Sequence, residues 1–154
     1  MLNHSSIPEL KMLAEALAQV LPEDHSSGDP PYLSRSALAI CLAAKWPADT
    51  LLDTGIDCAR RYWLGEASDE ERASVRSQVV ARAEILRKQG HHFSPEWCKH
   101  GLVMWALEVD SPSTMYEVDY LLECALKAGI SLEVIRKALE ENVPGLTAIL
   151  ALKG

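Results

Sequence analysis

The chain has 154 residues, of which 48% are apolar, and it carries a formal charge of −7 at pH 7. This length and apolar fraction are sufficient for a substantial core, so we predict one domain over residues 1–154. The negative charge argues against direct nucleic-acid binding, because that affinity comes from Lys and Arg side chains that neutralise phosphates. A basic protein would be a better-matched partner.

Apolar residues recur with a helical period along most of the chain, and capping or breaking residues separate the periodic segments. The strongest loop signal covers 22–33, where Pro, Gly, Ser and Asp are concentrated, and we expect this loop to be mobile. Helices are predicted over 8–21, 34–46, 51–64, 68–89, 95–109, 114–128, 132–143 and 146–152. These elements, about eight helices without a convincing strand, predict an all-α fold, either a single compact bundle or a stack of helical hairpins.

The segment 51–90 has the clearest pattern and is predicted to form two antiparallel helices. Gly65 stands where a left-handed residue ends the first helix. Ser68 and Glu71 fit a capping box, in which the hydroxyl accepts from one free amide and the carboxylate from the other. Long charged side chains lie along apolar surface with their heads in water, so we expect the arginines of the second helix to flank the core and pair with acids. These arginines are Arg72, Arg76, Arg82 and Arg87.

The cysteines and the distribution of apolar residues indicate the subcellular location. Cys41, Cys58, Cys98 and Cys124 are far apart and lack a Cys-x-x-Cys spacing, so we predict small buried hydrophobes. The chain does not open with a charged segment followed by an apolar one, and it contains no run of about 18 apolar residues. We therefore expect a cytoplasmic protein that makes no contact with a membrane.

No catalytic pattern is present: there is no Gly-x-Ser-x-Gly, no glycine-rich phosphate loop and no Glu-x-x-His pair. His91, His92, Cys98 and His100 lie within ten residues, but their spacing matches no strong zinc pattern. Cys98 and His100 would also point in nearly opposite directions on a helix. We therefore expect a protein without catalytic residues, metal or cofactor.

The predicted helix 114–128 carries the most informative surface. Its core face holds Val118, Leu122 and Ala125, and tyrosines and carboxylates occupy the other side. Tyr provides a large contact area at low entropic cost, so this face is a candidate for partner binding. The candidate residues are Glu108, Asp110, Tyr116, Asp119, Tyr120 and Glu123. The alternative is that the protein itself covers both faces of this helix.

The segment Asp57 to Glu66, DCARRYWLGE, resembles small all-helical bacterial immunity proteins of toxin systems. In those proteins an Ala-Arg-x-aromatic helix ends in Gly-Glu and is followed by a capped helix that contains arginines, here Ser68 to Arg87. The resemblance covers residues 57–87, and the sequence HHFSPEWCKHGLVMWALEV departs from the Ala- and His-rich helix expected next. It implies a cytoplasmic, non-catalytic protein that binds a co-encoded toxin domain directly.

We therefore expect an immunity protein that binds a basic toxin domain through the acidic, tyrosine-containing face. Two other classes are compatible with the sequence. A helical adaptor or regulatory domain would present the same surface to a different protein. A small helical enzyme or metal-binding protein would need an enclosed polar pocket or a bound metal.

Overall fold

The computed structural model describes residues 8–20, 32–109 and 115–153 of the chain. They contain α1 (Pro8–Val20), α2 (Tyr32–Ala43), α3 (Thr50–Trp63), α4 (Asp69–Lys88), α5 (Pro95–Ala106), α6 (Met115–Lys127), α7 (Leu132–Asn142) and α8 (Leu146–Lys153). No strand occurs within these ranges, so the predicted all-α class is confirmed. Of the loop predicted over 22–33, residues 22–31 lie outside the described part, and α2 begins within its last two positions.

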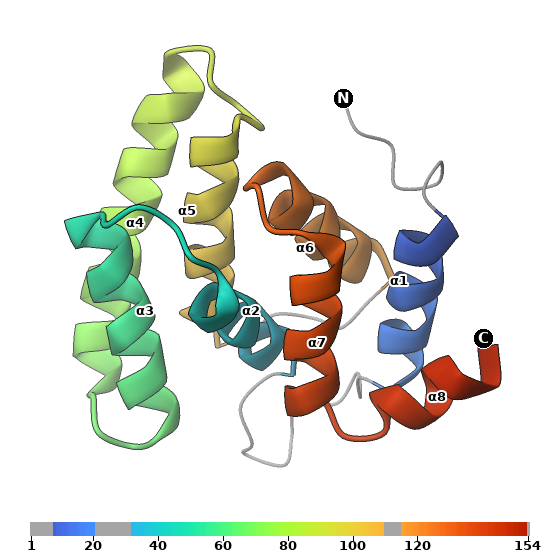
Figure 1. Cartoon of the computed structure of the whole chain (residues 1–154). Helices are drawn as coiled ribbons and strands as arrows, with labels where there is room; N and C mark the ends of the chain where they lie inside the picture. The colour runs from blue at the N-terminus through green and yellow to red at the C-terminus, as the bar shows by residue number, and fades with distance from the viewer. Residues whose placement is uncertain (1–7, 21–31, 110–114, 154) are drawn as a thin grey trace.

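The helices form one compact bundle around α5, which packs against α2, α3, α4 and α6. The α3–α4 hairpin lies on one side of the molecule, and α1 and α8 lie on the opposite side (Figure 1). One cluster of buried side chains takes residues from all eight helices. Its fully buried members include Leu10, Ile40, Leu102, Leu121 and Ile135. A single continuous core therefore holds the described helices together.

The predicted α3–α4 hairpin is confirmed, and local chemistry sets its corner. Gly65 has φ +79°, a backbone conformation that glycine adopts without steric cost. Ser68 caps α4, with its Oγ accepting from the Glu71 amide at 3.0 Å. The prediction that the Glu71 carboxylate accepts from the Ser68 amide is wrong. This carboxylate instead lies 2.8 Å from Arg61 and accepts from the Cys58 thiol. A charge-assisted contact across the hairpin has replaced a bond to a neutral amide.

The α4 arginines pair with acids as predicted. Arg76 reaches Glu108 at 2.9 Å, and Arg82 reaches Asp49 at 2.6 Å. The expectation that their heads lie in water is wrong for Arg72, which is only 8% exposed. Its Nη1 donates to the Leu107 carbonyl at 2.8 Å. This bond satisfies a carbonyl at the end of α5, so burial of the guanidinium joins α4 to the central helix.

All four cysteines are buried and free, as predicted. Burial raises the pKa of the Cys41 thiol to about 12. The hydrogen bond with the Cys98 thiol raises the pKa of Cys124, and burial raises it further. The Cys41 and Cys124 thiols therefore remain protonated near neutral pH, whereas the hydrogen bond with Cys124 lowers the pKa of Cys98. All four cysteines lie in the core as small side chains.

Candidate partner-binding surface

Three of the predicted binding residues, Asp119, Tyr120 and Glu123, lie on α6 with half-buried side chains. Asp110 and the side chain of Tyr116 lie outside the described part of the structure. Glu108 follows the end of α5, where its carboxylate pairs with Arg76 and its carbonyl accepts from a Ser34 hydroxyl on α2 at 2.7 Å. The contacts of Glu108 therefore join helices of the bundle.

Tyr120 belongs to an aromatic cluster. Its ring stands edge-on to Phe93 at 5.6 Å and to Trp105 at 5.4 Å between ring centroids. The expectation that Tyr120 points away from the core is wrong, because the ring packs against core residues while staying half-buried. Edge-to-face packing of this kind fixes the ring at a defined position. The outer side of α6 therefore presents a rigid aromatic side chain beside carboxylates.

Phe93, in the turn between α4 and α5, extends the cluster. Its φ of +62° lies in the left-handed region, which costs a residue with a Cβ about 1–2 kcal/mol. The ring packs against Trp97 at 5.1 Å and against His92 at 4.2 Å, and the Lys127 ammonium lies 5.2 Å from its centroid. Several neighbours thus hold Phe93 in an uncommon conformation, a type of strain often found at functional sites.

One stripe of α5 lies next to this cluster. Trp97, Gly101 and Trp105 follow each other at a spacing of four residues, so they share a helix face, and all three are half-buried. A Cβ built at Gly101 meets no atom within 4 Å outside its immediate chain neighbours, so open space lies above this glycine. We call the surface made by Phe93, Trp97, Gly101, Trp105, Asp119, Tyr120 and Glu123 the α5–α6 surface.

The charges on the α5–α6 surface are predominantly negative. Asp119 and Glu123 lie on α6, and Lys127 is engaged with the Phe93 ring. Trp and Tyr side chains are enriched among residues that dominate binding energy, and surrounding charges steer association. The arrangement therefore suits contact with a protein that carries positive charge around an apolar projection.

The residues considered for zinc binding have other roles. His100 is buried, and its Nε2 accepts from Arg82 Nε at 2.7 Å, which places the proton on Nδ1, 2.6 Å from the Glu96 carbonyl. Burial lowers the pKa of His100, so the ring is neutral. His91 and His92 are exposed. Within the described ranges, no three His, Cys, Asp or Glu side chains are grouped to hold a metal ion.

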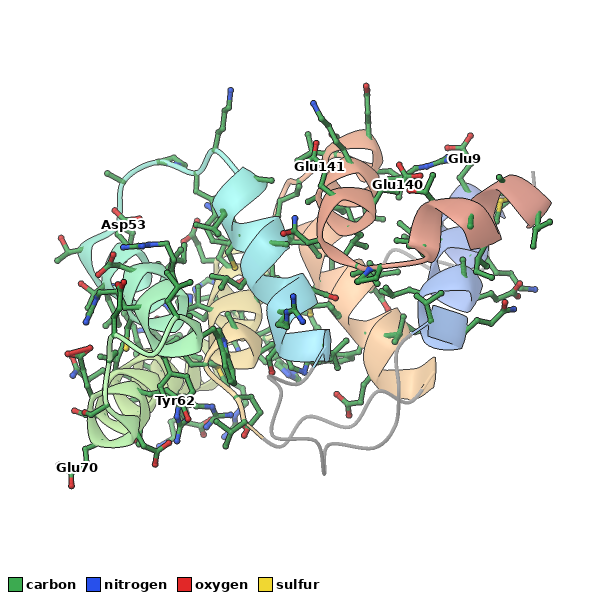
Figure 2. The ribbon with its side chains drawn as sticks, turned by 90° about the horizontal axis from the view of Figure 1, so that it is seen from below. Glu9, Asp53, Tyr62, Glu70, Glu140 and Glu141 are labelled. Atoms are coloured by element: carbon green, nitrogen blue, oxygen red, sulfur yellow. The ribbon has the colours of Figure 1, made fainter. Side chains whose placement is uncertain are left out.

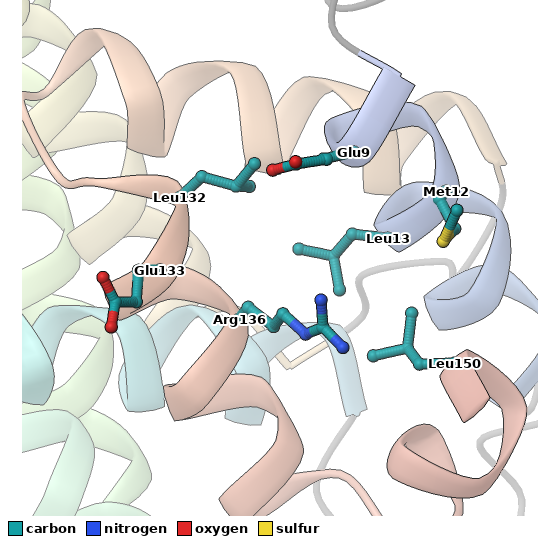
Figure 3. Close-up of a pocket in the computed structure, with 7 residues that line it drawn as sticks. All are labelled: Glu9, Met12, Leu13, Leu132, Glu133, Arg136 and Leu150. Carbon is teal, nitrogen blue, oxygen red and sulfur yellow. The ribbon is translucent and has the colours of Figure 1, made fainter. Parts of the chain in front are cut away.

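A hollow of about 250 Å³ lies between α1, α7 and α8, as Figure 3 shows. Met12, Leu13, Leu132 and Leu150 give it an aliphatic lining. The Arg136 side chain lies across it, whereas Glu133 points away from it (Figure 3). Its charged lining residues are Glu9, Glu133 and Arg136, and the Glu9 carboxylate extends toward Leu132 (Figure 3).

Comparisons with known proteins add no relative. No protein-family model, curated protein or solved structure gives a significant match to this chain. Among the described helices, none is both long and apolar enough to cross a bilayer.

Four residues of the α5–α6 surface were not selected from the sequence: Phe93, Trp97, Gly101 and Trp105. A sequence signal did exist, since the chain has four Trp and only one Phe. Side chains with a polar tip often lie where an interior meets water, as Trp97 and Trp105 do here.

Proposed function

We propose that this chain is a non-catalytic protein-binding module, a cytoplasmic immunity protein that neutralises a co-encoded bacterial toxin by binding it directly. The α5–α6 surface carries this proposal, because it combines rigid, half-buried aromatic rings with the carboxylates of Asp119 and Glu123. The net charge of −7 supports a basic toxin domain as the partner. An acidic protein can cover the site that such a toxin uses for its own polyanionic substrate.

The direct test is calorimetric titration of this protein with the purified product of the neighbouring open reading frame, at low and at moderate salt. The proposal expects a 1:1 complex, a lower affinity at the higher salt concentration, and loss of the neighbour's toxicity. Absence of a complex under both conditions would overturn the immunity assignment. A complex that leaves toxicity unchanged would favour an adaptor or regulatory role for the same surface.

Variants locate the site. Glu123→Lys and the double change Asp119→Lys with Glu123→Lys should each weaken the complex, since they place cations against a basic partner. The control is the double change Glu66→Lys with Glu70→Lys, which has the same net charge as the α6 double variant. Both control residues lie at the exposed α3–α4 corner, where Figure 2 labels Glu70. Circular dichroism verifies folding. Equal affinity loss in the α6 and control variants would reduce the effect to overall charge and overturn the site assignment.

A further inference from the structure

A groove on another face has the opposite charge character. It follows α2 and is bounded by the end of α3, and we define it by Arg35, Leu38, Leu42, Arg60, Trp63 and Leu64. Its volume is about 440 Å³. Figure 2, which views the molecule from below, shows α2 between α3 on one side and α7 on the other. The α2 groove is therefore shaped by three helices of the rigid bundle.

The floor of the α2 groove is apolar and accessible. Leu42 is 55% exposed and Leu64 is 63% exposed, whereas most large apolar side chains of the described chain are buried. Trp63 is half-buried and is fixed by a bond from its Nε1 to the Ala106 carbonyl at 2.9 Å. Exposed apolar side chains gathered beside a fixed indole ring are typical of an interaction site.

The rim of the α2 groove is positive. Among the described residues that line it, the charged ones are Arg35 and Arg60 and none is a carboxylate, in a chain where acids outnumber Lys and Arg by 22 to 15. Arg60 pairs with Asp57 at 2.9 Å, but both side chains are about half exposed, so water screens this contact. An acidic side chain that enters the groove could therefore bind the Arg60 guanidinium, whose N–H donors form a planar fork that matches a carboxylate.

The apolar strip continues along the rest of α2. A second hollow of about 300 Å³ lies beside the end of α2 and is lined by Ala43 and, from α7, by Val134, Lys137, Ala138 and Glu141. Val134 is 37% exposed. Both hollows are lined from α2 and α7: Leu42 and Asn142 line the first, and Ala43 and Glu141 line the second. The α2 residues that line them run from Arg35 to Ala43, a length of about 12 Å that matches a little over two turns of a helix.

We propose that the α2 groove is a second binding site, which receives an acidic amphipathic helix from a partner protein. The apolar face of that helix would cover Leu38, Leu42 and Leu64, and its flanking Asp or Glu side chains would bond Arg60. This is the helix-in-groove mode of recognition, in which anchors at helical spacing provide affinity and rim charges select the sequence. The site is separate in position and in charge from the α5–α6 surface.

The test uses the full-length protein and a phage-displayed library of random 16-residue peptides, with counter-selection on the variant Leu42→Glu with Leu64→Glu. Both leucines are exposed, so this variant should fold. The proposal expects recovered peptides with apolar residues at helical spacing flanked by Asp or Glu. Synthetic copies should bind in fluorescence anisotropy, and Arg60→Gln should weaken them about tenfold, the effect of one charge-assisted contact.

The matched control is Ile85→Glu with Leu152→Glu, which adds the same two charges at exposed apolar positions on α4 and α8 and should leave peptide affinity unchanged. Recovery of no peptide that distinguishes the parent from the leucine variant would overturn the proposal. Peptides without acidic residues, or peptides insensitive to Arg60→Gln, would also overturn it. Leucine-dependent binding to phosphatidylserine vesicles without any peptide binding would replace the protein partner with a lipid surface.

Discussion

Two glycines inside helices differ in the space around them. At Gly55 on α3, a Cβ atom would lie 2.5 Å from Val103 Cγ1 on α5, far inside ordinary contact distance. At Gly101 on α5, a Cβ atom meets nothing within 4 Å outside its immediate chain neighbours. Val103 is β-branched and buried in a helix, so it has little rotamer freedom with which to move away. The absence of a side chain at Gly55 therefore allows α3 to approach the central helix.

The change Gly55→Ala should lower the free energy of unfolding by about 1–2 kcal/mol, because overpacking destabilises the protein by more than the higher helix propensity of Ala stabilises it. Gly101→Ala should instead raise it by up to about 1 kcal/mol, since only the propensity gain applies there. Urea denaturation measures both. Equal stability of Gly55→Ala and Gly101→Ala would contradict the close contact between α3 and α5 at Gly55.

A second substitution at the same contact provides the control. Val103→Ala creates a cavity by itself, but in the Gly55→Ala background it also removes the atom that collides with the new methyl group. The double variant should therefore lose less stability than the sum of the two single variants. Additive losses would assign the Gly55→Ala cost to another cause.

At the scale of the element, Asp49 links the start of α3 to its neighbours. Its carboxylate accepts from the Leu52 amide at 3.0 Å and from Arg82 Nη2 at 2.6 Å. Burial opposes ionisation of this carboxyl, but the Leu52 and Arg82 donors outweigh that effect and hold its pKa below the ordinary value. Asp49 is thus both a helix cap and the partner of an arginine on α4.

Asp49→Ala should destabilise the protein by about 1–2 kcal/mol, since it removes a cap and an ion pair that is partly screened by water. Asp49→Ser keeps a capping oxygen and should cost less than 1 kcal/mol. Thermal unfolding followed by circular dichroism compares the two variants. Ser131→Ala, which removes only the cap of α7, calibrates the capping contribution. Equal losses for Asp49→Ala and Asp49→Ser would show that the capping oxygen contributes nothing.

The sequence predicted the ends of elements better than the contacts between them. Gly65 and Ser68 were identified because left-handed backbone and capping depend on a few adjacent residues, and α3 and α4 begin and end within one position of the predicted ranges. Burial of Arg72 was missed because it depends on the Leu107 carbonyl, 35 residues away. The packing of Tyr120 on Phe93 was missed for the same reason: the turn between α4 and α5 reaches it only in the folded chain.

At the scale of the whole molecule, three elements meet at His100. Asp49 precedes α3, Arg82 lies on α4, and His100 lies on α5, where its Nδ1 faces the Glu96 carbonyl. Arg82 donates to both other side chains, so the network joins the hairpin to the central helix. A protonated His100 could no longer accept from Arg82, and a buried imidazolium would face the half-buried guanidinium. Stability should therefore depend on the neutral state of one ring.

The pH dependence follows from the direction of the pKa shift. Burial lowers the folded-state pKa of His100, and Arg82 lowers it further, whereas an unfolded chain has the ordinary value of about 6.5. Between these values the unfolded state binds more protons, so the free energy of unfolding should fall as pH decreases from 7 towards 5. For one proton the slope is at most about 1.4 kcal/mol per pH unit.

Urea denaturation at several pH values measures this slope, and His100→Gln removes the titrating ring while an amide oxygen can still accept from Arg82. The variant should lose most of the pH dependence between 7 and 5. In this range the lowered pKa of Asp49 keeps its carboxyl ionised, so it adds no slope of its own. An unchanged slope in His100→Gln would assign the proton uptake to another group and exclude His100 as the residue that links folding to pH.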